Sequence, residues 1–302
     1  MRASHAAWLR RFMPRAAGWV LAAVVLVVAA QRVDLAALAA TLRRARWAPV
    51  ALALLCNLTA NTVARVRRWE VLLEQMPHRR RASFYDLLRL FYASVALNNL
   101  LPAKAGEAIR VIRLHRDRGY PPGALIAAQL AEKGIEAISL GLICGALALL
   151  PGANRAPLLL AGSLGAAAVL ILALLRGRPV SGAGKFLGAL CALHAERSWV
   201  RSLGWALVSD LADLLLVALC LRALGIDAPP PVWALVLLGV NFAILLPTTP
   251  GQIGVLEAGA VLALTSCGIA AAPAAGFAIV YHAVHLVPST ALGLLAVSLP
   301  WK

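Results

Sequence analysis

Long apolar segments, separated by short loops rich in arginine, dominate the pattern of this sequence. These segments predict membrane-spanning helices at residues 16–31, 47–64, 122–150, 156–175, 202–224 and 273–299. Their lengths are close to the roughly 20 residues that a helix needs to cross the hydrocarbon core of a bilayer. The pattern therefore predicts an all-α polytopic membrane protein.

Polar positions refine this picture around the second predicted span. Residues 31–47 carry leucine and valine on one side and arginine on the other, which is typical of an amphipathic helix on a membrane surface. Asn57, Asn61 and Arg65 recur at helical spacing, so we expect this stripe to face protein and not lipid. Seven arginines in residues 65–89 predict a cytoplasmic loop after the span.

Two further apolar segments are interrupted by proline and glycine. Residues 84–101 end at Pro102 and continue as 106–118, and residues 232–246 break at 247–251 and continue as 252–267. Both breaks read Leu-Leu-Pro-x-x-x-Gly, and they lie about half the chain apart. Proline removes a backbone donor and ends or kinks a helix. Broken segments at matching positions of two halves are typical of the binding site of a transporter.

Basic loops indicate how these broken segments meet the membrane. If residues 84–101 crossed completely, every later loop would change sides and the basic loop 176–201 would face outward. A re-entrant helical hairpin keeps the basic clusters cytoplasmic, as the positive-inside rule requires. We therefore predict two inverted repeats, 1–150 and 151–302, each with about three spans plus one re-entrant helical hairpin. The alternatives are an ordinary chain of seven or eight kinked spans and a coincidental motif.

Composition supports a single integral membrane domain. Apolar residues make up 61% of the chain and mean hydropathy is +0.80, whereas soluble domains average about 45–50% apolar. The net charge of +16 lies in loops between spans, so we exclude nucleic acid as a partner. The five cysteines are scattered, so no disulfide framework, metal site or cofactor is predicted. The basic, then apolar N-terminus is expected to be a retained first span, with both termini cytoplasmic.

The first hairpin carries the strongest candidate chemistry. A helix that starts near Gly106 would point its N-terminal amides into the membrane, where they could bind an anion. Lys104 lies beside it, and arginine can bind phosphate through two parallel hydrogen bonds. We expect Glu107 to hold one of these cations in place. The candidates here are Asn98, Asn99, Pro102, Lys104, Gly106, Glu107, Arg110 and Arg113. The alternative is that the arginines are interfacial anchors, which is the better interpretation for Arg116 and Arg118.

Further candidates lie on the third predicted span and the second hairpin. Gln129, Glu132, Lys133 and Glu136 share one helix face that could complete a cavity, or could form an exposed charge ladder. The second hairpin offers hydroxyls, close backbone and one carboxylate from Pro247, Thr248, Pro250, Gly251, Gly254 and Glu257. Glu257, His282 and His285 could relay protons. The alternative is that the histidines make ordinary interhelical hydrogen bonds.

Four of these features resemble a known family. They are Arg67-Arg68-Trp69 with Leu72-Leu73, the segment Asn98 to Glu107 with Arg110, Glu132-Lys133 with Glu136, and the segment Pro247 to Glu257. In this order they resemble the flippase-like family named for the transmembrane region of lysylphosphatidylglycerol synthases. Lys104, Gln252 and His282 depart from the pattern that we expect for that family. The chain holds no segment that could be the soluble aminoacyl-transfer domain of the synthases, so the resemblance implies lipid translocation and not aminoacylation.

These features predict a lipid flippase or transporter in the bacterial inner membrane, and not an enzyme. Its partners would be membrane lipids, either an anionic phospholipid or a polyprenyl-phosphate-linked glycolipid, because relatives are associated with such lipids and with hopanoid pathways. The first alternative is a non-transporting lipid-binding or scaffold subunit. A membrane glycosyltransferase that uses Asp210 and Asp213 is the second alternative, although its expected large outer loop is missing from the sequence pattern.

Overall fold

A computed structural model describes residues 34–74, 76–101, 105–151, 155–175, 198–244 and 249–298, the side chains of 171–175 excepted. All regular structure in these residues is helical, as the sequence predicts. The predicted first span, residues 16–31, lies outside the described residues. The helices are α2 (Leu35–Arg43), α3 (Trp47–Cys56), α4 (Thr62–Leu73), α5 (Phe84–Leu100), α6 (Ala105–Arg113), α7 (Pro122–Leu147), α8 (Arg155–Leu175), α10 (Ser198–Ala223), α11 (Pro230–Ala243), α12 (Val255–Ser266) and α13 (Ala271–Ser298).

Three short elements join or interrupt these helices. The π-helical turn η1 (Asn57–Asn61) connects α3 to α4 without a break, η2 (Leu114–Arg118) ends α6 as a π turn, and η3 (Pro250–Gln252) is a 3₁₀ turn before α12. Within the described residues, three helical segments are long and apolar enough to cross a membrane: Trp47–Leu73, Ser198–Ala223 and Ala271–Ser298. Shorter apolar helices cover Arg155–Leu170 and Pro230–Ala243.

The helix that contains α3 and α4 is longer than the sequence predicts. We expected it to end at residue 64, where a basic loop begins, but it runs to Leu73. The expectation was wrong because the arginines were interpreted as part of a solvent-exposed loop. Arg65 and Arg68 instead point into the protein and pair with carboxylates there. The charged end of this segment is therefore part of the packed interior.

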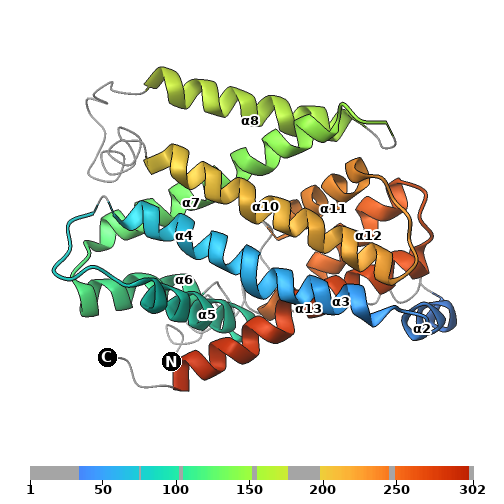
Figure 1. Ribbon diagram of the computed structural model, residues 1–302, viewed down its shortest axis with the longest axis horizontal. Helices are drawn as coiled ribbons and strands as arrows, with labels where there is room; N and C mark the ends of the chain where they lie inside the picture. The colour runs from blue at the N-terminus through green and yellow to red at the C-terminus, as the bar shows by residue number, and fades with distance from the viewer. Residues whose placement is uncertain are drawn as a thin grey trace, which may run out of the picture.

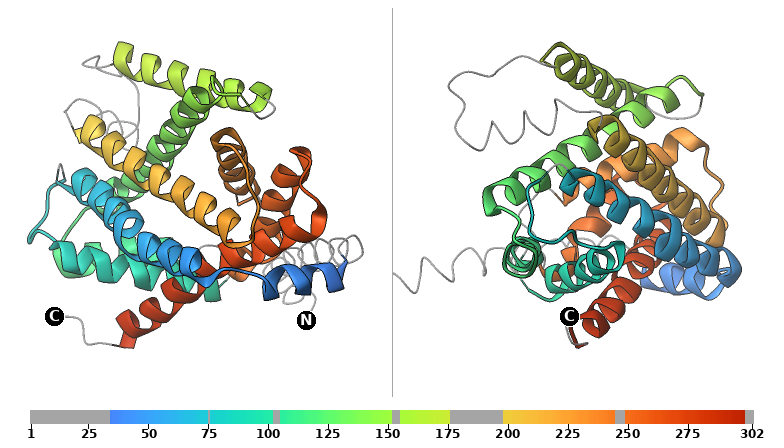
Figure 2. Two further views of the ribbon diagram at one scale, coloured as in Figure 1. Left: turned by 45° about the vertical axis from the view of Figure 1, so that its right-hand side comes forward. Right: turned by 60° about the vertical axis from the view of Figure 1, so that its left-hand side comes forward.

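Several helices lie side by side. Figure 1 shows α3 and α4 end to end, beside α10, across the middle of the molecule. α2 and the loop that follows α10 lie at the right-hand end, and the loop between α4 and α5 lies at the left-hand end. Figure 2 shows α8 at the edge of the molecule, packed against α7, which runs at a steep angle to α8 and α10.

Glycines allow two helix pairs to approach closely. A Cβ atom added at Gly259 on α12 would lie only 2.6 Å from the carbonyl oxygen of Gly239 on α11. On α7, a Cβ atom at Gly145 would lie 2.9 Å from the Cα atom of Gly162 on α8. Small residues at such contacts are typical of membrane helices, because van der Waals packing takes the place of the hydrophobic effect there.

The buried apolar side chains of the described residues form two large cores and a small third cluster at Tyr92, Ala93 and Ala296. One core gathers α7, α10, α11, α12 and α13 around Phe277 and Leu216. The other gathers α4, α5 and α7 around Trp69, Leu72 and Leu87. Among the described residues, the buried polar and charged side chains include Asn57, Asn61, Arg68, Arg110, Glu132, Asp210, Asp213 and His282. Since buried charges persist only when they are paired, these side chains are the candidates for a functional site.

Candidate functional site

Arg65 joins three helices inside the molecule. From α4 its Nη1 donates to Glu136 Oε1 on α7 at 3.1 Å, and its Nη2 donates to Asp213 Oδ2 on α10 at 2.8 Å. Both carboxylates are largely buried. Lys133 Nζ, which is itself exposed, reaches the other oxygen of Glu136 at 3.2 Å. Arg65 therefore compensates two carboxylates that would each be costly to bury alone.

One turn along α4, Arg68 belongs to a second, deeper cluster. Arg68 Nη2 donates to Glu132 Oε1 at 3.1 Å, and Arg110 Nη1 on α6 donates to Glu132 Oε2 at 3.3 Å. The Arg110 guanidinium carbon lies 4.6 Å from the ring centroid of Trp69 and 5.5 Å from that of Phe91. Two guanidinium groups thus share one carboxylate, and aromatic rings cover one of them.

Within the described residues, this cluster retains unused hydrogen-bond donors. Arg68 is 1% exposed, yet its Nε and Nη1 have no hydrogen-bond partner, and neither has Nε of the buried Arg110. An arginine presents five N–H donors in a rigid fork and accepts nothing. These three unpartnered nitrogens, beside the carboxylate that the two arginines share, can therefore donate hydrogen bonds to a further anionic or acceptor group.

The two asparagines of η1 extend the network toward α13. Asn61 Nδ2 donates to Asp213 Oδ1 at 2.6 Å, and Asn57 Nδ2 donates to the carbonyl oxygen of Val284 at 3.0 Å. His285 Nε2 lies 3.9 Å from Asp213 Oδ1, and its ring lies beside that of Tyr281. The expectation that Asn57, Asn61 and Arg65 face protein is confirmed.

At the first proline–glycine motif, α6 begins in close contact with α5. The Gly106 N–H donates to Asn98 Oδ1 at 2.8 Å, and a Cβ atom at Gly106 would overlap the carbonyl oxygen of Ser94. Only glycine fits at this point. The Glu107 backbone oxygen accepts a bond from Gln129 Nε2 at 2.9 Å.

The second motif is organised by a carboxylate. Glu257 Oε2 accepts from the Gly254 N–H at 2.7 Å and so caps α12, and its Oε1 lies 2.6 Å from His282 Nδ1. His282 Nε2 lies 2.9 Å from the carbonyl oxygen of Gly251, which has a φ of 67°. Both ring nitrogens of His282 thus lie within hydrogen-bond distance of an acceptor.

The two motifs meet in space. A Cβ atom at Gly251 would lie 3.5 Å from the carbonyl oxygen of Asn99, at the end of α5. Asn99 Nδ2 donates to Thr290 Oγ1 on α13 at 2.8 Å. The contact joins the first broken helix pair, α5 and α6, to the second pair, α11 and α12.

Comparison with known proteins agrees with this architecture. A sequence model of the lysylphosphatidylglycerol synthase TM region matches residues 15–293. The chain belongs to the lysylphosphatidylglycerol synthase transmembrane-region family. A search of curated proteins finds no match. Membership of this family and the apolar helices make the chain a multi-pass membrane protein, and the family name links it to lipid modification.

For this member of the lysylphosphatidylglycerol synthase transmembrane-region family, the structure brings some of the predicted site residues together and separates others. Arg110, Glu132, Lys133 and Glu136 lie in one network, joined through Arg65 and Arg68. Glu257 and His282 form a separate pair, with Gly251, Gly254 and Pro250 around it. Pro102, Lys104, Pro247 and Thr248 lie outside the described residues.

Three expectations change in detail. Glu107 does not hold Arg110 in place, because Arg110 pairs with Glu132. Arg113 pairs with Asp117 at 3.4 Å. The two histidines have different partners, because His285 lies near Asp213 whereas His282 binds Glu257.

The predicted binding residues of this family member did not include Arg65, Arg68 or Asp213. Arg65 was expected to face protein, but the stretch that contains it and Arg68 was assigned to a cytoplasmic loop, and Asp213 was named only for the glycosyltransferase alternative. The spacing of Arg65 and Arg68, three apart on one helix, places both on one helix face. Glu132 and Glu136, four apart on another helix, also share a face, so the two arginines can pair with the two carboxylates. Among the described residues, no group of three or more His, Cys, Asp or Glu side chains could hold a metal ion.

Proposed function

We propose that this protein is a flippase that moves an anionic or phosphate-bearing lipid across the bacterial inner membrane. The observation that carries the proposal is the guanidinium pair of Arg68 and Arg110, which shares Glu132 and keeps three nitrogens without a hydrogen-bond partner among the described residues. A phosphate oxygen can accept from such donors. The head group would be bound there while its acyl chains stay in the surrounding lipid. The partner is therefore an anionic phospholipid or a polyprenyl-phosphate-linked glycolipid.

We further propose that the broken helix pairs form the route. In this proposal α5 with α6, and α11 with α12, are re-entrant hairpins of two inverted repeats. The contact of Asn99 with Gly251 supports it, because hairpins that enter from opposite sides must meet near the middle of the membrane. Non-helical backbone is tolerated there when it is buried in protein or lines a cavity. Glu257 and His282 would hold the proton that couples the movement.

One observation favours a second candidate, a scaffold that binds lipid without moving it. Arg110 is nine-tenths buried and covered by Trp69 and Phe91, so the cluster is closed in this conformation. A scaffold needs no opening, whereas a flippase must expose Arg110 during each cycle. Asp213 accepts hydrogen bonds from Arg65 and Asn61. This carboxylate is therefore not free for the role that a glycosyltransferase would give it.

Reconstitution tests the proposal. Vesicles with the purified protein and a phosphatidylglycerol labelled on one acyl chain are treated with a membrane-impermeant quencher, and the inward-to-outward rate is measured. Wild type should exceed protein-free vesicles, Arg110→Gln should lose at least about tenfold, and Arg116→Gln, at an exposed arginine, should match wild type.

A paired variant separates transport from folding. Arg110→Gln leaves Glu132 with one partner fewer, so misfolding could imitate loss of transport. Arg110→Gln with Glu132→Gln removes both charges and should fold, as thermal unfolding will show, but should not transport. Wild-type rates equal to those of empty vesicles would refute the flippase and leave the scaffold. Full transport by the folded double variant would refute the assigned head-group site.

A further inference from the structure

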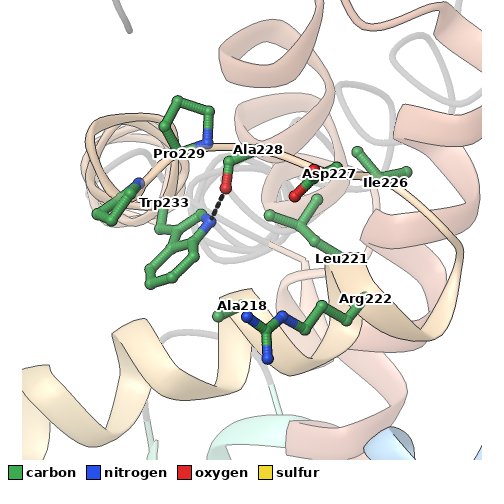
Figure 3. A pocket seen from close by; sticks show the side chains of 9 residues that line it. Ala218, Leu221, Arg222, Ile226, Asp227, Ala228, Pro229 and Trp233 are labelled. Atoms are coloured by element: carbon green, nitrogen blue, oxygen red, sulfur yellow. Dashed lines mark hydrogen bonds between the residues drawn. The ribbon is translucent and has the colours of Figure 1, made fainter. Parts of the chain in front are cut away.

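A pocket lies where α10 ends and α11 begins, far along the chain from the network of Arg68 and Arg110. It has a volume of about 410 Å³, within the range of roughly 300–1,000 Å³ that small-molecule sites occupy. Its walls are apolar side chains and prolines together with three polar or aromatic ones, Arg222, Asp227 and Trp233. Figure 3 shows Arg222 reaching into the pocket from α10 and Trp233 from α11.

The polar groups of this pocket are available for a ligand. Arg222 and Asp227 are both exposed, and among the described residues neither makes an ion pair, with each other or with a third group. Trp233 is different, because its Nε1–H donates to the carbonyl oxygen of Ala228 at 2.8 Å. That bond fixes the indole, so the ring presents a rigid apolar and π-electron surface to the pocket. The pocket therefore offers a cation and an anion that make no ion pair among the described residues, together with an aromatic ring that is held in place by its own hydrogen bond.

Neighbouring elements place the pocket at the level of lipid head groups. Arg222 is in the last turn of α10, one of the candidate spans, and the hydrocarbon core of a bilayer that this span crosses would end near its last turn. The amphipathic helix α2 lies at the same end, and the Arg46 N–H donates to the carbonyl oxygen of Ala223 at 2.7 Å. Amphipathic helices lie in the interface plane, and tryptophan and arginine are typical of the same depth.

We propose that this pocket binds a zwitterionic phosphate–ammonium head group, such as that of phosphatidylethanolamine. Arg222 would bind the phosphate, Asp227 the ammonium, and Trp233 would contact the ammonium through its ring face. The apolar walls formed by Leu221, Ile226 and the prolines would contact the carbon chain of the head group and the glycerol. Asp227 repels a head group that has phosphate alone, so the pair of opposite charges selects zwitterions over anionic lipids.

This inference does not rest on the proposed transport. Binding is measured at equilibrium, so a scaffold can show it and a flippase can lack it. The full chain is purified in detergent and titrated with phosphatidylethanolamine or phosphatidylglycerol, and bound lipid is counted by native mass spectrometry. Wild type should bind phosphatidylethanolamine at least about tenfold more tightly than phosphatidylglycerol.

Three variants make the assignment specific. Arg222→Gln should weaken phosphatidylethanolamine at least about tenfold, as expected for loss of one charge-assisted hydrogen bond. Asp227→Asn should abolish the preference over phosphatidylglycerol. Arg155→Gln, at an exposed arginine that begins α8 outside the pocket, should bind as wild type does. Thermal unfolding shows whether each variant is folded. Because Arg222 and Asp227 are both exposed, their substitution should leave the unfolding temperature unchanged.

Soluble phosphoethanolamine identifies the source of the head group. Displacement of the lipid by an excess of the free compound assigns the pocket to a soluble zwitterion, and retention assigns it to the membrane lipid. Equal binding of the two lipids by wild type, or equal binding by Arg222→Gln and Arg155→Gln, would overturn the proposal.

Discussion

Arg65 is the residue on which the stability of the buried network should depend most. Arg65→Gln removes the cation that bridges Glu136 and Asp213 at 3.1 and 2.8 Å. Glu136 keeps Lys133, but Asp213 is left with Asn61 as its nearest donor. Removal of one partner from a buried ion pair costs about 3–5 kcal/mol, and the 27% exposure of the Arg65 side chain argues for the lower end. At about 2 °C per kcal/mol, the unfolding temperature should fall by about 6 °C.

A matched control isolates the effect of burial. Arg201 bonds to Glu74 at 2.9 Å, a pair of the same length and chemistry, but the Arg201 side chain is 57% exposed. Exposed pairs contribute about 0–1 kcal/mol, so Arg201→Gln should change the unfolding temperature by no more than about 2 °C. Both variants are measured side by side in the same detergent by intrinsic tryptophan fluorescence during heating.

The double variant of Arg65→Gln with Asp213→Asn tests the pairing itself. The Asn side chain keeps an oxygen to accept from Asn61 and removes the uncompensated charge, so about half of the lost stability should return, a coupling of about 1.5 kcal/mol. If Arg65→Gln and Arg201→Gln lowered the unfolding temperature equally, or if the double variant were no more stable than the single one, the buried network would not be a stabilising unit.

Further predictions concern the packing and the caps. Gly259→Ala on α12 places a methyl group 2.6 Å from the Gly239 carbonyl oxygen and should lower the free energy of unfolding by about 1–3 kcal/mol. Gly204→Ala on α10, where nothing lies within 4 Å of the added methyl group, should be neutral or stabilising. Thermal unfolding compares the two variants. Glu257→Ala removes both the cap on Gly254 and the partner of His282 and should cost about 1–3 kcal/mol, and Glu257→Gln should cost less because it keeps an acceptor. Partial burial raises the pKa of Asp86 at the start of α5, but hydrogen bonds from Ser83 and the Arg118 guanidinium outweigh it and hold that pKa below the usual 3.8. Asp86 therefore stabilises the fold above about pH 4 and loses this contribution as the pH falls through its folded pKa, so the difference in unfolding temperature between wild type and Asp86→Asn should vanish on acidification.

The helices were predictable where the sequence carries local signals. Proline at 229–231 and glycine at 225, 251, 254 and 268 mark the ends that the structure shows for α10, α11 and α12. Ser83 and Asp86 form the capping box that begins α5. Such signals act over a single turn, so they can be recognised without knowing what the helix packs against.

Partner choice was not predictable for the network. Glu132 was recognised as a candidate, but nothing along the chain shows that its partners are Arg68 on α4 and Arg110 on α6. The same three letters, Arg-Arg-Trp, fit either a cytoplasmic loop or a buried cluster. Only the packing of α4 against α7 decides between them, because it removes Arg68 from water and brings the carboxylate within reach.

The π turn at Asn57–Asn61 sets how the second half of the long segment from Trp47 to Leu73 is rotated relative to the first half. A π turn contains one residue more than an α turn, and each residue rotates a helix by about 100°. If the same residues formed a regular α-helix, everything after the turn would be rotated about the axis by about 100°, so Arg65 and Arg68 would point away from Glu132, Glu136 and Asp213. The extra residue therefore adjusts the rotation of the charged half of this continuous helix relative to its apolar half. Each half can then contact its own neighbours.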